Sequence, residues 1–174
     1  EPPEGVLFLL TADSLAGVLP TIRSRCVSFA VAPVSPADCA RYCAAQGVDP
    51  KDAALYSELF DGHIGTVLTA ARDDVRREQV EKALTLAKAA ASQDSYAAAV
   101  LLSAYEKDKA GAVALLRDFR AVAAAGLRQS PRSPLQGDAA RKALGAADAA
   151  IQRIRAQVNP KIVLSVLAAK FRGF

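Results

Sequence analysis

The stretch that decides the fold is residues 138–171, which read DAARKALGAADAAIQRIRAQVNPKIVLSVLAAKF. Apolar side chains recur there at helical spacing in two sets: Leu144, Ala147, Ile151, Ile154 and Val158, then Ile162, Val163, Val166 and Leu167. Between the two sets, Asn159 and Pro160 supply a helix cap and a first-position proline. The pattern predicts two consecutive helices, the first capped by Asp138, whose apolar stripes lie in the core or in a subunit interface.

Helix signals of the same kind run back along the chain and predict a mainly α-helical protein. Ser35-Pro36 and Asp49-Pro50 each combine a capping side chain with a proline at the first helical position. Helices are expected over 36–46, 50–60, 64–74, 76–91, 93–104, 108–127, 138–158 and 160–171. Alanine, at 38 of 174 residues, favours helix throughout. The proline- and serine-rich residues 130–134 are expected to form a loop.

Residues 1–33 have a different character, with two apolar runs that are typical of buried strands. VLFLLT at 6–11 and CVSFAV at 26–31 are the candidates. Between them, Asp13 or Ser14 is expected to cap a short helix over 15–18, and Pro20 to begin another turn. Two strands do not make a stable sheet, so the rest of the sheet is expected upstream. The absence of Met likewise leads us to expect an internal fragment of a longer protein.

Charge divides the chain into an acidic front and a basic back. Residues 1–75 hold 5 Lys and Arg against 10 Asp and Glu, whereas residues 76–174 hold 17 against 8. A basic helical module can bind nucleic acid or an acidic protein, although a solvated helical surface would look the same. No aromatic residues interleave with the basic ones, so single-strand binding is weakly supported. The sequence predicts three parts: 1–33, 34–75 and 76–174.

Motifs of self-contained catalysis are missing from the sequence. It has no phosphate-binding loop, no G-x-G-x-x-G and no H-E-x-x-H. The carboxylates at Asp49, Asp52 and Asp73-Asp74 are better explained as helix-end residues than as an acid–base pair. No active site is therefore expected in this chain, and whether the protein is an enzyme stays open.

The number and spacing of the cysteines indicate the redox environment of the protein and whether it could bind a metal ion. Cys26, Cys39 and Cys43 are too few and odd in number for a disulfide framework, which indicates a reducing, cytoplasmic location. Only His63 could join them as a fourth zinc ligand, and no C-x-x-C pair exists, so no metal site is expected. The apolar runs are too short to span a membrane.

The segment LPTIRSRC at 19–26 is the strongest candidate for a functional site in the sequence. It places Arg23 and Arg25 two residues apart on a turn just before a candidate strand. They are either two exposed charges or a guanidinium group offered to phosphate, for which the planar arginine fork is well suited.

This segment, together with EPPEGVLFLLT at 1–11, resembles the clamp-loader subunits of bacterial DNA polymerase III, which belong to the AAA+ ATPases. The resemblance implies that 1–33 is a remnant of an AAA+ α/β domain. It implies that 34–75 is a three-helix lid and that 76–174 is a helical collar bundle through which subunits associate. Asn159-Pro160 and the apolar helix after it resemble the last collar helix.

The resemblance also implies residue roles. Arg25 would be an arginine finger, reaching the nucleotide site of a neighbouring subunit and stabilising charge at the γ-phosphate. Ser24 and Cys26 would set its backbone position, with Arg23 secondary. Thr11 would occupy the sensor 1 position of the nucleotide site. The chain itself would bind no cofactor, and ATP would sit in the neighbour.

Within the family, one position indicates the subunit type. The motor subunit carries an arginine in its lid where this chain has Gly65, in the segment GHIGTVL at 62–68. This departure favours the delta-prime type over the gamma/tau motor subunit. The implied function is loading of the sliding clamp onto primer-template DNA during replication, with gamma/tau and delta subunits as partners. The alternatives are the motor subunit itself and a basic helical nucleic-acid-binding module.

Overall fold

The computed structural model describes residues 3–12, 14–31 and 34–174. The first two residues of the clamp-loader-like segment, Glu1 and Pro2, and the candidate cap Asp13 lie outside the described residues, as do Ala32 and Pro33. The chain divides into two compact units, Glu1–Ala32 and Pro33–Phe174. The described residues form nine α-helices, two short 3-10 helices and no β-strand, so the mainly helical prediction is confirmed.

Within residues 3–12 and 14–31, the first unit contains a 3-10 helix, η1 (Leu15–Gly17), and one α-helical turn, α1 (Pro20–Arg23), as its only helices. Ser14 caps η1, because its Oγ accepts a hydrogen bond from the amide of Ala16 at 3.2 Å. The prediction of a turn beginning at Pro20 is confirmed as well.

The strands predicted over 6–11 and 26–31 are not formed in the described part of this unit. A strand is stabilised by the hydrogen-bond ladder of a neighbour, and these two segments exchange no backbone hydrogen bond. Their apolar side chains are exposed, with Leu9 at 86% and Phe29 at 84% of full exposure. An apolar run therefore indicates what a segment would bury, but without a pairing partner it does not become a strand.

Three short helices begin the second unit, close to the bounds predicted for them. They are α2 (Pro36–Ala45), α3 (Pro50–Leu59) and α4 (Ile64–Arg72). Ser35 caps α2 by accepting a hydrogen bond from the amide of Asp38, and Asp49 caps α3 through the amides of Lys51 and Asp52. In both cases proline occupies the first helical position, as the sequence predicted.

Five further helices complete the second unit: α5 (Asp74–Ala91), α6 (Ser95–Ser103), α7 (Lys109–Leu127), α8 (Gly137–Arg155) and α9 (Pro160–Lys170), with η2 (Phe171–Gly173) after them. Capping side chains precede four of them: Asp73, Asp94, Asp108 and Asn159. The cap predicted at Asp138 is wrong. The helix begins one residue earlier, and Asp138 lies in its first turn, where Arg141 and Lys142 pair with it and lower the pKa of its carboxyl.

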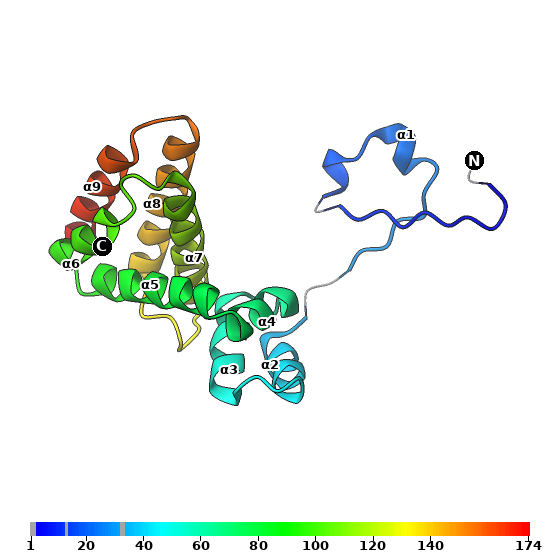
Figure 1. Cartoon of the computed structure of the whole chain (residues 1–174), viewed down its shortest axis with the longest axis horizontal. Coiled ribbons are helices and arrows are strands. Elements are labelled where there is room, and N and C mark those ends of the chain that lie inside the picture. Colours follow the sequence, from blue (N-terminus) through cyan, green and yellow to red (C-terminus); the bar gives the residue numbers. More distant parts are fainter. Residues whose placement is uncertain (1–2, 13, 32–33) are drawn as a thin grey trace. The chain divides into compact units, whose positions relative to one another are not determined.

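Within this unit, α7 packs between α5 and α8, and α9 packs against α6 and α8. Figure 1 shows α2, α3 and α4 gathered at the end of α5 where that helix begins. The rings of Phe119 on α7 and Phe171 after α9 stack in the core, with centroids 5.8 Å apart. Buried apolar side chains form one cluster that extends from Cys39 on α2 to Phe171.

The apolar stripes predicted on the last two helices are only partly buried. Ala147, Ile151 and Ile154 on α8 and Val163 and Leu167 on α9 are in the core. In contrast, Ile162 and Val166 are exposed, because α9 packs against its neighbours through one face and these side chains lie outside it. Val158 is also exposed, because α8 ends at Arg155 and Val158 lies in the connection to α9. In the described residues, no helix combines the length and apolar character needed to cross a bilayer.

Candidate functional site

The arginine predicted to act on a neighbour, Arg25, lies just after helix α1. Its amide donates to the carbonyl oxygen of Ile22 at 3.0 Å, and its Nη1 to that of Thr21 at 3.5 Å. Pro20 begins the helical turn that creates this arrangement, because its fixed φ suits a first helical position. Arg25 is exposed, and no carboxylate within the described residues pairs with it.

Of the other residues predicted for this site, Ser24 and Cys26 lie next to Arg25 in the chain, whereas Thr11 does not. Ser24 is the C-cap residue of α1, and its Oγ donates to the carbonyl oxygen of Thr21 at 3.2 Å. Cys26 is a free, exposed thiol. Thr11 is exposed in a segment without regular secondary structure, and no hydrogen bond joins it to Arg25 among the described residues. The structure thus gathers Ser24, Arg25 and Cys26 by sequence proximity and leaves Thr11 separate.

Gly65, at which the resemblance implied a difference between subunit types, is the second residue of α4. A Cβ atom placed on it would meet nothing within 4 Å. The absence of a side chain here is therefore not required by packing, and a longer residue would project into open space.

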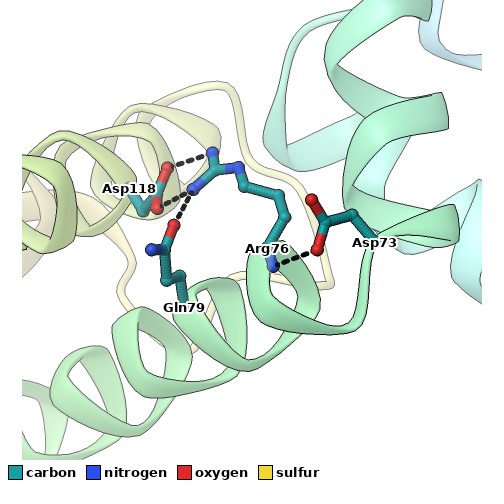
Figure 2. Close-up of polar contacts among 4 residues, drawn as sticks. All are labelled: Asp73, Arg76, Gln79 and Asp118. Atoms are coloured by element: carbon teal, nitrogen blue, oxygen red, sulfur yellow. Dashed lines mark hydrogen bonds and ion pairs between the residues drawn. The ribbon is translucent and has the colours of Figure 1, made fainter.

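A largely buried polar cluster in the second unit joins α5 to α7 (Figure 2). Arg76 donates from Nη2 to Oδ1 of Asp118 at 2.6 Å and from Nη1 to Oδ2, so that the pair is bidentate. Nη1 also donates to Oε1 of Gln79 at 3.3 Å, while the backbone amide of Arg76 donates to the capping carboxylate of Asp73. On its other side the guanidinium lies 5.6 Å from the ring centroid of Phe60 at the end of α3.

This cluster is structural in character, since every group in it is satisfied by the protein itself. The side chain of Asp118 is only 6% exposed, and its hydrogen bonds to Arg76 raise the pKa of that guanidinium, which stays charged. Sequence reasoning missed the pair. The available signal was an aspartate on the buried side of α7, between Leu115 and Val122, because a charge at such a position needs a partner.

The loop between α7 and α8 is fastened to the end of α3. Ser130 Oγ donates to Oε2 of Glu58, and Arg132 pairs with the same carboxylate at 3.9 Å. Arg128 donates to the backbone oxygen of Glu58 at 3.1 Å and pairs with Asp61 at 3.3 Å. A segment whose composition predicts only a loop therefore ties the three short helices to the longer ones.

Two packed helices, α6 and α9, present exposed apolar side chains. They run antiparallel, since Arg172 bonds Ser95 at one end and Lys161 pairs with Glu106 at the other. The exposed apolar residues on α6 are Tyr96 and Val100, and those on α9 are Ile162 and Val166. Tyr96 at 78% and Ile162 at 60% exposure are the most open of the four. Faces of this kind are typical of protein contacts.

The two helical cysteines, Cys39 and Cys43, are fully buried on one face of α2. Burial raises the pKa of the Cys43 thiol, and the neighbouring Cys39 adds to the increase. They behave as small apolar core residues rather than as nucleophiles. Among the residues that the structure describes, no three His, Cys, Asp or Glu side chains gather as a metal site would require.

Comparison with known proteins adds no further assignment: no protein-family model, no curated protein and no solved structure matches this chain.

Proposed function

We propose that this chain is part of a delta-prime-type subunit of a bacterial DNA polymerase III clamp loader, the assembly that places the sliding clamp on primer-template DNA during replication. The observation that carries the proposal is the segment LPTIRSRC at 19–26 following EPPEGVLFLLT at 1–11. The exposed position of Arg25 after the turn begun by Pro20 supports it. In this proposal the first unit derives from an AAA+ domain, 34–75 is the lid and 76–174 the collar.

Arg25 acts in this proposal on ATP bound by an adjacent gamma/tau subunit. A guanidinium at the γ-phosphate stabilises the charge that spreads over the equatorial oxygens in the transition state. Ser24 and Cys26 hold the backbone of the turn, and Thr11 contributes to the chain's own nucleotide-site remnant. The chain binds no cofactor itself and works in the cytoplasm with gamma/tau and delta subunits.

Association in this proposal uses the exposed apolar faces of α6 and α9. Apolar contacts are not screened by salt as charges are. The full chain should therefore bind the gamma/tau subunit saturably at both 0.1 M and 0.5 M salt, as measured by sedimentation. Absence of binding at either salt would contradict the collar assignment.

The finger assignment is tested in the reconstituted clamp loader with R25A and, as the matched control, R23A. Arginine fingers contribute about 10³-fold or more to turnover. R25A should assemble normally but lower clamp-stimulated ATP hydrolysis at least tenfold, whereas R23A should stay within about twofold of the original. Unchanged hydrolysis in an assembled R25A complex would remove the finger assignment.

Gly65 favours the delta-prime type over the motor subunit in this proposal, since glycine offers no side chain to a phosphate. The open space at this position makes the distinction testable. If the chain belonged to a motor subunit, another residue would have to replace the missing lid arginine. ATP binding by the complete subunit in isolation, lost on removal of a different lid arginine such as Arg72, would favour the motor alternative.

A further inference from the structure

The exposed side of the α7–α8 pair carries a row of cationic side chains. Two contacts across the pair, Lys109 Nζ to Gln157 Oε1 at 2.8 Å and Arg120 Nε to Asp148 Oδ1 at 2.7 Å, show that the helices run antiparallel. The same contacts show which sides of the two helices form a common surface.

Helical spacing then decides which other residues share that surface. On α7, Arg117 lies eight residues after Lys109 and three before Arg120, and it is exposed. On α8, Arg141 and Arg155 lie seven residues to either side of Asp148, so all three are on one stripe. We name this surface the basic face and define it by its cations: Lys109, Arg117, Arg120, Arg141 and Arg155.

The charge of the basic face is only partly neutralised by the chain itself. Its two carboxylates, Asp148 and Asp138, pair with Arg120 and Arg141. Neither Arg117 nor Arg155 forms an ion pair or a side-chain hydrogen bond within the described residues. Five cations against two carboxylates leave a positive surface, and the two arginines without a partner lie on different helices.

We propose that the basic face binds the phosphate backbone of a nucleic-acid duplex. The face extends about 21 Å along α8 between Arg141 and Arg155, at about 1.5 Å per residue. A duplex strand carries one phosphate per about 3.4 Å, so the face spans about six phosphates of one strand. Four of its five cations are arginines, whose planar fork donates two hydrogen bonds to one phosphate.

The side chains between the cations indicate which polyanion fits. No aromatic residue is exposed on α7 or α8 in the described structure, so the face offers no platform for stacking the bases of a single strand. Small residues such as Ala124 and Gly145 lie between the cations, so no bulky side chain there would keep a phosphate backbone away from them. An acidic protein partner would be expected to use a large apolar group at the centre of the contact. The large apolar side chain exposed on these helices is that of Leu127, and it lies at the last residue of α7.

The inference stands on the second unit alone and does not depend on the clamp-loader proposal, because no residue of the finger segment takes part in it. It assigns a sequence-independent binding mode, since phosphate contacts position a protein on a duplex without reading bases.

The test measures binding of the full chain to a fluorescent 20-base-pair DNA duplex by anisotropy at a series of salt concentrations. The variant R117A/R155A removes two cations of the basic face. The matched control R41A/R153A removes two exposed arginines elsewhere, one of them on α8 only two residues from Arg155. A third variant, R117K/R155K, keeps the charge. Circular dichroism checks that each variant is folded.

Each lost phosphate contact reduces the slope of log affinity against log salt by about 0.9. R117A/R155A should therefore lower the slope by about 2 and weaken binding at low salt at least tenfold, whereas the control should change the slope by less than 1. R117K/R155K should keep most of the slope.

Four results would overturn the proposal. They are no duplex binding at 50 mM salt, equal losses in R117A/R155A and the control, tighter binding of a single strand of the same length, and tighter binding of polyglutamate of matched charge. The last result would assign the face to an acidic protein instead.

Discussion

Gly126 on α7 lies directly against the carbonyl oxygen of Leu135, in the loop before α8. A Cβ atom on Gly126 would be 1.9 Å from that oxygen and 3.1 Å from Oγ of Ser133. The helix and the loop therefore touch backbone to backbone, which only glycine permits at this position. The contact matters because the same loop fastens α3 to the longer helices through Glu58.

Replacing Gly126 by alanine should consequently destabilise the protein. The added methyl group cannot be accommodated without shifting the loop, and overpacking of this kind costs about 2 kcal/mol. Gly145→Ala is the control, since Gly145 lies inside α8 with nothing within 4 Å of its Cβ position. That change should stabilise the protein by about 0.5–1 kcal/mol, because alanine favours helix. Urea denaturation measures both, and a stable G126A protein would contradict the close contact.

Because the ion pair between Arg76 and Asp118 is largely buried, removing its carboxylate should destabilise the protein more than removing the carboxylate of the exposed pair between Arg120 and Asp148. Asp118→Ala leaves a guanidinium uncompensated in a largely buried position, which costs about 3–5 kcal/mol. Asp148→Ala breaks the exposed pair with Arg120 and should cost about 0–1 kcal/mol. Thermal or urea denaturation measures the difference.

A double variant separates the loss of the ion pair from a general packing defect at this position. R76M/D118L removes both charges, and it should regain much of the stability lost in D118A because no charge is left unpaired. Equal stability losses for D118A and D148A would show that the pair between Arg76 and Asp118 is not buried as described.

Ser133 should contribute more to stability than an ordinary loop serine. It is buried, its Oγ lies 2.8 Å from the carbonyl oxygen of Val122, and it accepts a hydrogen bond from the amide of Leu135 at 3.2 Å. Ser133→Ala removes the acceptor of the Leu135 amide and a hydrogen bond to the carbonyl oxygen of Val122, at a cost of about 1–3 kcal/mol. Ser103→Ala, in an exposed position of α6, should change the free energy of unfolding by less than about 0.5 kcal/mol. Similar values for the two would contradict this role.

The raised pKa of Cys43 predicts that stability falls at alkaline pH. Burial raises the pKa of this thiol in the folded protein, so the unfolded chain loses the proton first. The stabilisation is thus fully present below the ordinary thiol pKa of about 8.5 and is lost as pH rises through the folded-state value. Burial raises the pKa of the Tyr56 hydroxyl as well, so the free energy of unfolding should decrease further above about pH 10.

Chemical denaturation between pH 7.5 and 10 measures this dependence. Cys43→Ala should flatten the decline, by up to about 1.4 kcal/mol per pH unit where the thiol titrates. Cys26→Ala, which removes an exposed thiol, should leave it unchanged. An identical slope in all three proteins would show that Cys43 does not contribute.

Local signals predicted the helices well because capping is a local interaction. Ser35, Asp49 and Asn159 hold amides two or three residues away, so the information lies within one turn of chain. The error at Asp138 has the same origin. A carboxylate near a helix start suits the positive end of the helix dipole whether it caps or lies in the first turn.

Non-local features were outside the reach of such reasoning. The partners Arg76 and Asp118 are separated by 42 residues, and Glu58 and Ser130 by 72. Apolar runs at 6–11 and 26–31 predicted strands because periodicity reports what a segment would bury, not whether a pairing neighbour exists. For the candidate site, the sequence predicted both a role for Arg25 and the turn that begins at Pro20, while the hydrogen bonds from Arg25 to Ile22 and Thr21 come from the structure.

The single core cluster running from Cys39 to Phe171 has a consequence for how the second unit unfolds. If the short and the long helices had separate cores, each would melt at its own temperature. A shared core, tied by Arg76 to Asp118 and by Ser130 to Glu58, couples their melting instead. Calorimetry of this unit should therefore show one transition, in which the calorimetric enthalpy equals the van't Hoff enthalpy.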